Sequence, residues 1–135
     1  MTAFAWNESY SVRVAQFDAQ HRKLFELVNR LADAMRVGKG NDVIREVVDE
    51  LAVYTRTHFL QEEVAMQQTK YPAYDAHHAQ HSKLLAEVEK FKGELTGGGK
   101  PNVVGVLNFL RLWLVEHIQK SDQAYSAHLN AHGMR

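Results

Sequence analysis

The sequence predicts an all-α protein, an up-down-up-down antiparallel four-helix bundle with an N-terminal arm and a short C-terminal tail. Long stretches of the chain repeat apolar residues every three or four positions, which is the periodicity of an amphipathic helix. Only two prolines interrupt the 135 residues, and no stretch alternates apolar and polar residues as a strand does. Four such helices joined by short connections pack as antiparallel neighbours. No repeat or second domain is apparent, so we expect a single domain over residues 1–135.

The first two helices are predicted at about residues 18–37 and 42–68. Asp18 is a suitable N-cap for the first helix. Residues 38–41 contain two glycines, which end this helix and allow the next to begin. The inner stripe of the first helix comprises Leu24, Val28, Leu31 and Met35 below His21. The inner stripe of the second helix comprises Ile44, Val48, Leu51, Thr55, His58, Glu62 and Met66.

The third and fourth helices are predicted at about residues 73–95 and 103–120. Pro72 separates the second helix from the third, because proline cannot continue the preceding helical turn. A glycine-rich flexible connection over residues 96–102 separates the third helix from the fourth. The inner stripe of the third helix comprises His77, His81, Leu84, Val88, Phe91 and Leu95. That of the fourth comprises Val103, Leu107, Leu110, Leu114 and His117. We expect a non-periodic arm before the first helix, and a short helical turn with a loose tail after the fourth.

Composition excludes several classes of function. Lys and Arg balance Asp and Glu at 16 each, so nothing indicates a nucleic-acid partner or an acidic membrane surface. The absence of cysteine excludes disulfides, thiolate zinc sites and iron–sulfur clusters. No run of about 18 apolar residues predicts a membrane span, and the N-terminus lacks the pattern of a secretory signal. These features lead us to expect a cytoplasmic protein.

The most informative pattern is a set of metal-ligand side chains at helical spacing. The set comprises His21, His58, Glu62, His77, His81, His117 and Asp122. A spacing of four residues places Glu62 on the same helix face as His58, and His81 on the same face as His77. Asp122 follows His117 by five residues, so the helix would have to loosen or bulge there for both side chains to meet.

The antiparallel topology predicts that these side chains converge. In such a bundle, the first and third helices start at the end where the second and fourth helices finish. His21 and His77 lie near helix starts, whereas His58 and His117 lie near helix finishes. All seven side chains therefore fall at one end of the bundle, a coincidence that scattered surface histidines would not produce.

The size of the set indicates two metal ions. A structural zinc ion usually takes four ligands, so seven would exceed its needs. Two six-coordinate ions bridged by both carboxylates and by an oxide or hydroxide would use all the donors and leave one position open for a small molecule. Imidazole suits Zn, Cu, Fe and Ni, whereas bridging carboxylates favour Fe or Mn. We hypothesise that the excess of histidine stabilises ferrous iron and favours reversible binding over oxygenase chemistry.

Four blocks of the chain, in order, resemble the hemerythrin family, specifically the bacterial single-domain hemerythrins. The first block is FDAQHRKLF at residues 17–25, and the second is HFLQEE at residues 58–63, followed by Met66. The third is Tyr71-Pro72 leading into His77 and His81, and the fourth is WLVEHI at residues 113–118, followed by Asp122 and Tyr125. The resemblance covers nearly the whole chain.

This resemblance implies a centre of two non-haem iron ions bridged by an oxide or hydroxide, Glu62 and Asp122. His21 and His58 would ligate one iron, and the other iron would be bound by His77, His81 and His117. Dioxygen would bind reversibly at the iron with two histidines, inside a dry apolar pocket that keeps water from the bound oxygen. The residues of this oxygen pocket would be Phe59, Trp113, Leu114 and Ile118.

The implied function is oxygen carriage, storage or delivery by a monomer that is not an enzyme. An oxygen-using enzyme or a reductase would be its protein partner. Two other functions remain open: an oxygen or redox sensor, and a di-iron enzyme acting on nitric oxide, peroxide or ferrous iron. Repeated consumption of a substrate would distinguish the enzyme from the carrier.

Several residues outside the seven have other expected roles. Family members often have glycine where this chain has Arg13. This difference concerns the path of the N-terminal arm and not the metal site. His78 should face solvent, because adjacent helical residues point about 100° apart. Glu63 should lie on the surface or behind the ligands. Tyr125 either hydrogen-bonds near the site or anchors the tail. His128 and His132 repeat the four-residue spacing, but they have no carboxylate partner and are not expected to be ligands.

Overall fold

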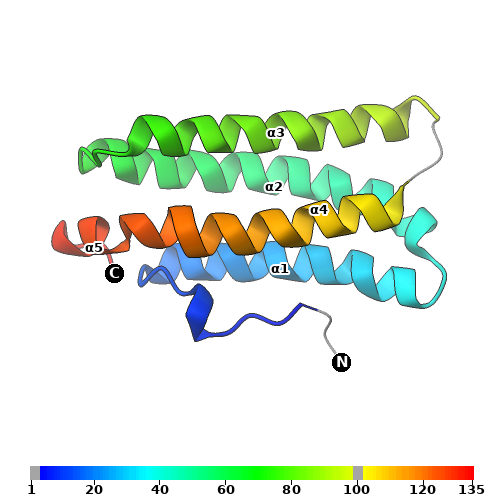
Figure 1. Ribbon diagram of the computed structural model, residues 1–135, viewed down its shortest axis with the longest axis horizontal. Coiled ribbons are helices and arrows are strands. Elements are labelled where there is room, and N and C mark those ends of the chain that lie inside the picture. The colour runs from blue at the N-terminus through cyan, green and yellow to red at the C-terminus, as the bar shows by residue number, and fades with distance from the viewer. Residues whose placement is uncertain (1–3, 99–101) are drawn as a thin grey trace.

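A computed structural model describes residues 4–98 and 102–135 of the chain, and it confirms the predicted four-helix bundle (Figure 1). The helices are α1 (Ala15–Arg36), α2 (Gly40–Gln68), α3 (Tyr74–Thr96), α4 (Val103–Glu116) and α5 (Gln123–Ala131). A 3₁₀ turn, η1 (Glu8–Tyr10), precedes α1, and a π-helical turn, η2 (His117–Asp122), joins α4 to α5. None of the helices in this described part combines the length and apolar character needed to cross a bilayer.

Left-handed backbone residues end the helices near the predicted positions. Gly38, with φ of 77°, follows α1, and Gly98, with φ of 78°, follows α3. Between α2 and α3, Lys70 adopts φ of 58° just before the predicted break at Pro72. Asn102 caps α4, since its side chain accepts a hydrogen bond from the backbone N–H of Gly105 at 3.1 Å. Residues 1–3 of the predicted arm and 99–101 of the predicted glycine-rich connection lie outside the described residues.

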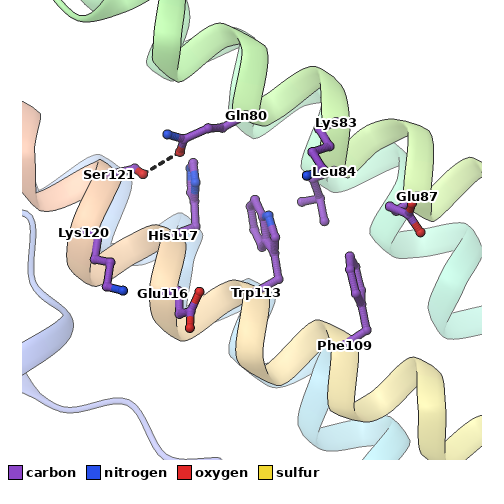
Figure 2. A pocket seen from close by; sticks show the side chains of 10 residues that line it. All are labelled: Gln80, Lys83, Leu84, Glu87, Phe109, Trp113, Glu116, His117, Lys120 and Ser121. Atoms are coloured by element: carbon purple, nitrogen blue, oxygen red, sulfur yellow. Dashed lines mark hydrogen bonds between the residues drawn. The ribbon is translucent and has the colours of Figure 1, made fainter.

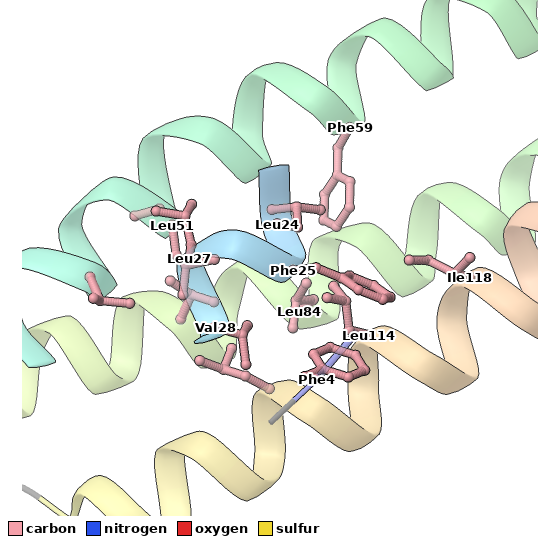
Figure 3. Packing of buried hydrophobic residues seen from close by; sticks show 14 of the residues in the cluster. Phe4, Leu24, Phe25, Leu27, Val28, Leu51, Phe59, Leu84, Leu114 and Ile118 are labelled. Atoms are coloured by element: carbon pink, nitrogen blue, oxygen red, sulfur yellow. The ribbon is translucent and has the colours of Figure 1, made fainter. Parts of the chain in front are cut away.

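The predicted inner stripes form the core of the bundle. Every residue assigned to a stripe is buried except Met35 and Phe91, which are partly buried and pack against the same cluster. Figure 3 shows Leu24 of α1, Phe59 of α2 and Leu84 of α3 pointing into this common interior. Burying apolar area contributes about 25 cal/mol per Å² removed from water. The four stripes therefore set the rotation of each helix about its axis, and with it the direction of the ligand side chains.

The C-terminal segment is more ordered than the sequence predicts. Instead of a loose tail, residues 123–131 form α5, in which Tyr125 and Leu129 are fully buried. The hydroxyl of Ser126 donates a hydrogen bond to the carbonyl of Val12 at 2.6 Å. His128 lies 2.8 Å from the carbonyl of Thr69 through Nε2. The expected short helical turn is therefore a nine-residue helix, because the partners of α5 are distant in sequence, at the arm and at the end of α2.

The N-terminal arm is held by Asp18, although Asp18 is not the N-cap that its position predicts. Helix α1 begins three residues earlier, at Ala15. The carboxylate of Asp18 instead accepts hydrogen bonds from the hydroxyl of Ser11 at 2.7 Å and the backbone N–H of Val12 at 2.8 Å. Arg13 then adopts φ of 58°, a left-handed conformation that costs a non-glycine residue about 1–2 kcal/mol. A glycine at this position would adopt the same conformation without that cost.

We expect Asp18→Ala to lower the free energy of unfolding by about 1–3 kcal/mol, because hydrogen bonds to a charged group are lost and two donors lose their partner. Urea unfolding of the variant and the wild type measures the difference. The control is Asp33→Ala, which removes an exposed carboxylate paired with Arg36 on the same helix and should change stability by less than about 1 kcal/mol. Equal effects of the two substitutions would show that Asp18 does not hold the arm.

Candidate metal centre

All seven predicted ligand side chains lie together at one end of the bundle, and none is more than 5% exposed. They form two groups of donor atoms, and within each group the atoms lie within 4.8 Å of one another. The three-histidine group comprises His77, His81, His117, Glu62 and Asp122, and the two-histidine group comprises His21, His58, Glu62 and Asp122. The two carboxylates belong to both groups. This division is the one that the resemblance implies, while ligation of a metal by these atoms stays a prediction.

The π-helical turn η2 brings Asp122 into the cluster. In a regular α-helix, a spacing of five residues would turn Asp122 well away from His117. The wider turn of η2 compensates, so that Oδ1 of Asp122 lies 3.0 Å from Nε2 of His117. The loosening that the five-residue spacing requires is therefore present. His58 and Glu62 need no such device, because their four-residue spacing in α2 already places their side-chain atoms 3.2 Å apart.

Three of the four carboxylate oxygens, Oε1 of Glu62 and both oxygens of Asp122, face imidazole nitrogens but lack hydrogen-bond donors within the described chain. Oδ1 of Asp122 lies 2.9 Å from Nε2 of His77, and Oδ2 lies 3.1 Å from Nε2 of His21. These contacts lack hydrogen-bond geometry, and within the described chain neither oxygen of Asp122, nor Oε1 of Glu62, has a donor. Buried polar atoms are normally satisfied, so unpaired oxygens converging with nitrogens are typical of a metal site. The donor set fits two transition-metal ions that share the carboxylates.

Both carboxyl groups remain ionised despite their burial. Burial alone would raise the pKa of Glu62, but the neighbouring imidazoles of His58, His21 and His81 outweigh it and hold this pKa well below its ordinary value. Burial and the charge of Glu62 likewise oppose ionisation of Asp122. The imidazoles of His117 and His21 overcome this opposition, so the pKa of Asp122 is also well below its ordinary value. The cluster therefore presents two negative charges to any cation that enters it.

The two histidines of the smaller group respond differently to these charges. Burial favours the neutral ring of His21, yet contacts with Asp122 and Glu62 raise its pKa to about 10. Burial is decisive for His58 and lowers its pKa below the ordinary value, although Glu62 acts in the opposite direction. In the protein alone, a proton on His21 thus offsets part of the carboxylate charge. A metal ion would have to displace that proton to use Nε2 of His21.

Tyr125 contacts the cluster directly. Its hydroxyl donates a hydrogen bond to Oε2 of Glu62 at 2.5 Å. Burial, together with the charges of Glu62 and Asp122, raises the pKa of Tyr125 well above its ordinary value, so the hydroxyl keeps its proton. The position of Tyr125 near the end of the chain left its role open. The structure shows that α5 delivers this side chain to the site while also closing the core.

Two residues outside the seven bind the outer nitrogens of the histidine rings. Oε1 of Gln20 lies 2.5 Å from Nδ1 of His58, and Oε2 of Glu63 lies 2.7 Å from Nδ1 of His81. Glu63 thus takes the second of its two expected locations, behind a ligand. Sequence reasoning missed Gln20, because each contact joins two different helices and no spacing along the chain encodes it. Adjacency to His21 was the only available signal.

Aromatic side chains cover the three-histidine group. Phe59 stacks on His81 with ring centroids 3.7 Å apart, and Trp113 stacks on His117 at 4.4 Å. Leu114 and Ile118 are buried. Figure 2 shows Trp113 and His117 pointing from α4 and η2 toward α3. Both residues line a cavity of about 410 Å³. Of the four residues predicted to form an oxygen pocket, only Trp113 lines this cavity. Of the seven predicted ligand residues, only His117 lines it.

The remaining histidines stay outside the two donor groups. His78 is exposed as expected, yet its Nδ1 lies 2.7 Å from Oε1 of Glu63, so solvent is not its only partner. His128 and His132 lie on α5 and just beyond it, with ring centroids 4.5 Å apart. Their nitrogen contacts go to backbone carbonyls, those of Thr69 and His128 respectively. The four-residue spacing of this pair is therefore not a metal-binding signal.

Comparisons with known proteins place this geometry in a family. Residues 12–129 match the family model described as the hemerythrin HHE cation binding domain. The chain is 31% identical over 132 residues to a bacteriohemerythrin of Methylococcus capsulatus, covering 97% of this chain and all of that protein. It is 28% identical over 122 residues to hemerythrin subunit 1 of Golfingia vulgaris, covering 90% of each. A crystal structure of a wild-type hemerythrin superposes with a TM-score of 0.87 at 31% identity, covering 94% of this chain and 98% of that one. The chain therefore belongs to the hemerythrin family.

Proposed function

We propose that this protein binds dioxygen reversibly at a non-haem di-iron centre, for oxygen carriage, storage or delivery. The observation that carries the proposal is the pair of buried donor groups sharing Glu62 and Asp122. His21 and His58 would hold one iron, and the other would be held by His77, His81 and His117. When bound in the ferrous state, the two ions supply the electrons for reversible dioxygen binding.

The protein's own contribution is to hold the donors and exclude water. Tyr125 fixes one oxygen of Glu62 by its hydrogen bond, which leaves Oε1 directed at His58 and His81 at 3.2 and 3.4 Å. Phe59, Leu114 and Ile118 are buried around the ligands and keep the surroundings apolar. Excluding water protects a reactive centre from side reactions such as irreversible oxidation. The donor set has five neutral imidazoles and only two carboxylates. This excess of neutral ligands stabilises ferrous iron and supports reversible binding over oxygenase chemistry.

Oxygen return to the reduced protein tests this function. The chain is loaded anaerobically with ferrous iron, analysed for metal, and then exposed to oxygen and returned to anaerobic conditions while optical spectra are recorded. We expect about two iron ions per chain and a spectral change that forms and vanishes with oxygen. Loading well below that level, or an irreversible change, would contradict the proposal. Repeated consumption of nitric oxide, peroxide or ferrous iron would favour an enzyme, and an oxygen-dependent complex with another protein would favour a sensor.

His77→Ala should prevent stable loading of the second iron, because it removes one of three imidazoles from the larger group. We expect affinity for that ion to fall at least about tenfold, measured by ferrous iron titration against a chelator. The matched control is His132→Ala, which removes an exposed histidine outside the donor groups and should leave both ions bound. Full loading of His77→Ala with an unchanged spectrum would refute the assignment of His77 as a ligand.

The proton on His21 predicts how pH acts on the metal-free protein. A folded-state pKa of about 10, against an ordinary value of 6.5, gives stability that is complete below pH 6.5 and lost as the pH rises through about 10. Glu62 and Asp122 act at acid pH. Their lowered pKa values give stability that is lost as the pH falls below the ordinary pKa of a carboxyl group. The lowered pKa of His58 adds to this acid loss, because the buried neutral ring opposes protonation below 6.5.

Urea unfolding between about pH 7 and 9.5 isolates the alkaline part of this profile. The wild-type free energy of unfolding should decline by up to about 1.4 kcal/mol per pH unit more than that of His21→Gln, which has no titrating ring at this position. Iron loading of the wild type should remove this excess decline from its own profile, since the ion takes the place of the proton. Parallel profiles for the two metal-free proteins would show that His21 does not hold a proton in this range.

A further inference from the structure

The two donor groups differ in the side chain that contacts the outer ring nitrogen, Nδ1, of one of their histidines. In the three-histidine group, the ring of His81 contacts the carboxylate of Glu63 through Nδ1 at 2.7 Å. In the two-histidine group, the ring of His58 contacts the amide oxygen of Gln20 through Nδ1 at 2.5 Å. One partner carries a full negative charge, and the other is neutral. This asymmetry lies entirely outside the seven residues of the cluster.

Each partner also determines which ring nitrogen faces the cluster. A carboxylate only accepts hydrogen bonds, so a neutral His81 ring carries its proton on Nδ1 and directs the lone pair of Nε2 inward. That Nε2 lies 3.2 Å from Nε2 of His117 and 3.4 Å from Oε1 of Glu62. For His58 the argument holds through Gln20, whose amide nitrogen donates to Oε1 of Gln61. This bond leaves the amide oxygen of Gln20 to accept from His58.

Glu63 is itself held in one orientation. Its second oxygen, Oε1, contacts Nδ1 of His78 at 2.7 Å, so both carboxylate oxygens are engaged. The ring of His78 in turn stacks on Tyr74, with centroids 5.7 Å apart. The Glu63 side chain is only 14% exposed, which limits the screening of its charge by water. Glu63 is thus a fixed, partly buried charge directed at a single ring of the cluster.

We propose that Glu63 is a positioning residue that orients His81 and makes the three-histidine group the stronger electron donor, with Gln20 as its neutral counterpart in the other group. An imidazole bound to a carboxylate through its outer N–H is a more basic ligand than one bound to an amide. The ion in the three-histidine group is thereby bound more tightly and stabilised in its oxidised state. This inference rests on the proposed di-iron function and specifies how the protein makes the two irons unequal.

Three substitutions separate orientation from charge. Glu63→Ala removes the acceptor and should weaken binding of one ferrous ion by about 10–100-fold, measured anaerobically against a competing chelator. Glu63→Gln keeps an acceptor oxygen without the charge, so both ions should load while the midpoint potential of the iron rises. Gln20→Glu places a carboxylate behind His58 and should lower the midpoint potential. The control is Glu116→Gln, which removes an exposed charge beside His117 in sequence and should shift the potential less than Glu63→Gln does.

The outcomes that overturn the inference are distinct from failure of the proposed function. If the wild-type chain binds no iron, the proposed function fails, and this inference fails with it. If the wild type loads both ions and Glu63→Ala does so with equal affinity, Glu63 does not position His81. Equal shifts in potential for Glu63→Gln and Glu116→Gln would show that any nearby charge acts alike, which overturns the role of the hydrogen bond. A lower affinity in Glu63→Ala with an intact helical spectrum supports it.

Discussion

Two ionised carboxylates, Glu62 and Asp122, are buried side by side, and the rest of the structure depends on how their charge is balanced. Moving an unpaired carboxylate out of water costs several kcal/mol, so such a pair persists only when neighbouring groups compensate it. Five imidazoles surround the pair, and contacts with the two carboxylates raise the pKa of one of them, His21, to about 10. The same arrangement that stabilises the two charges creates a set of donors for cations.

The bundle serves this pair by fixing helix ends rather than helix middles. The apolar stripes fix the orientation of each helix about its axis. The antiparallel topology brings the starts of two helices and the ends of two others together (Figure 1). The π-helical turn η2 departs from regular helix geometry at the site, and it places Asp122 beside His117. Because the chain continues into α5 after this turn, Tyr125 returns to the cluster and holds Glu62. The π-helical turn η2 and the helix α5 that follows it therefore act together to position Asp122 and Glu62.

The surroundings of the cluster add an asymmetry that its ligands alone do not have. A carboxylate stands behind His81 and an amide behind His58, while aromatic rings stack on His81 and His117.

The relatives share about 30% of their residues with this chain, yet the wild-type hemerythrin structure superposes with a TM-score of 0.87. Most positions can thus change while the bundle persists, since stripes of apolar residues constrain volume and periodicity more than identity.

The sequence by itself determined the helices, their inner stripes and the convergence of seven side chains, because periodicity and chain direction are properties of single segments. The loosened turn between His117 and Asp122 was also predictable, since no regular helix brings residues at that spacing together. Only the tertiary structure decided that Asp18 binds the arm, that α5 closes the core, and that Glu63 lies behind His81. Those contacts join segments remote in sequence, and they depend on helix rotation and side-chain rotamers that no spacing along one segment encodes.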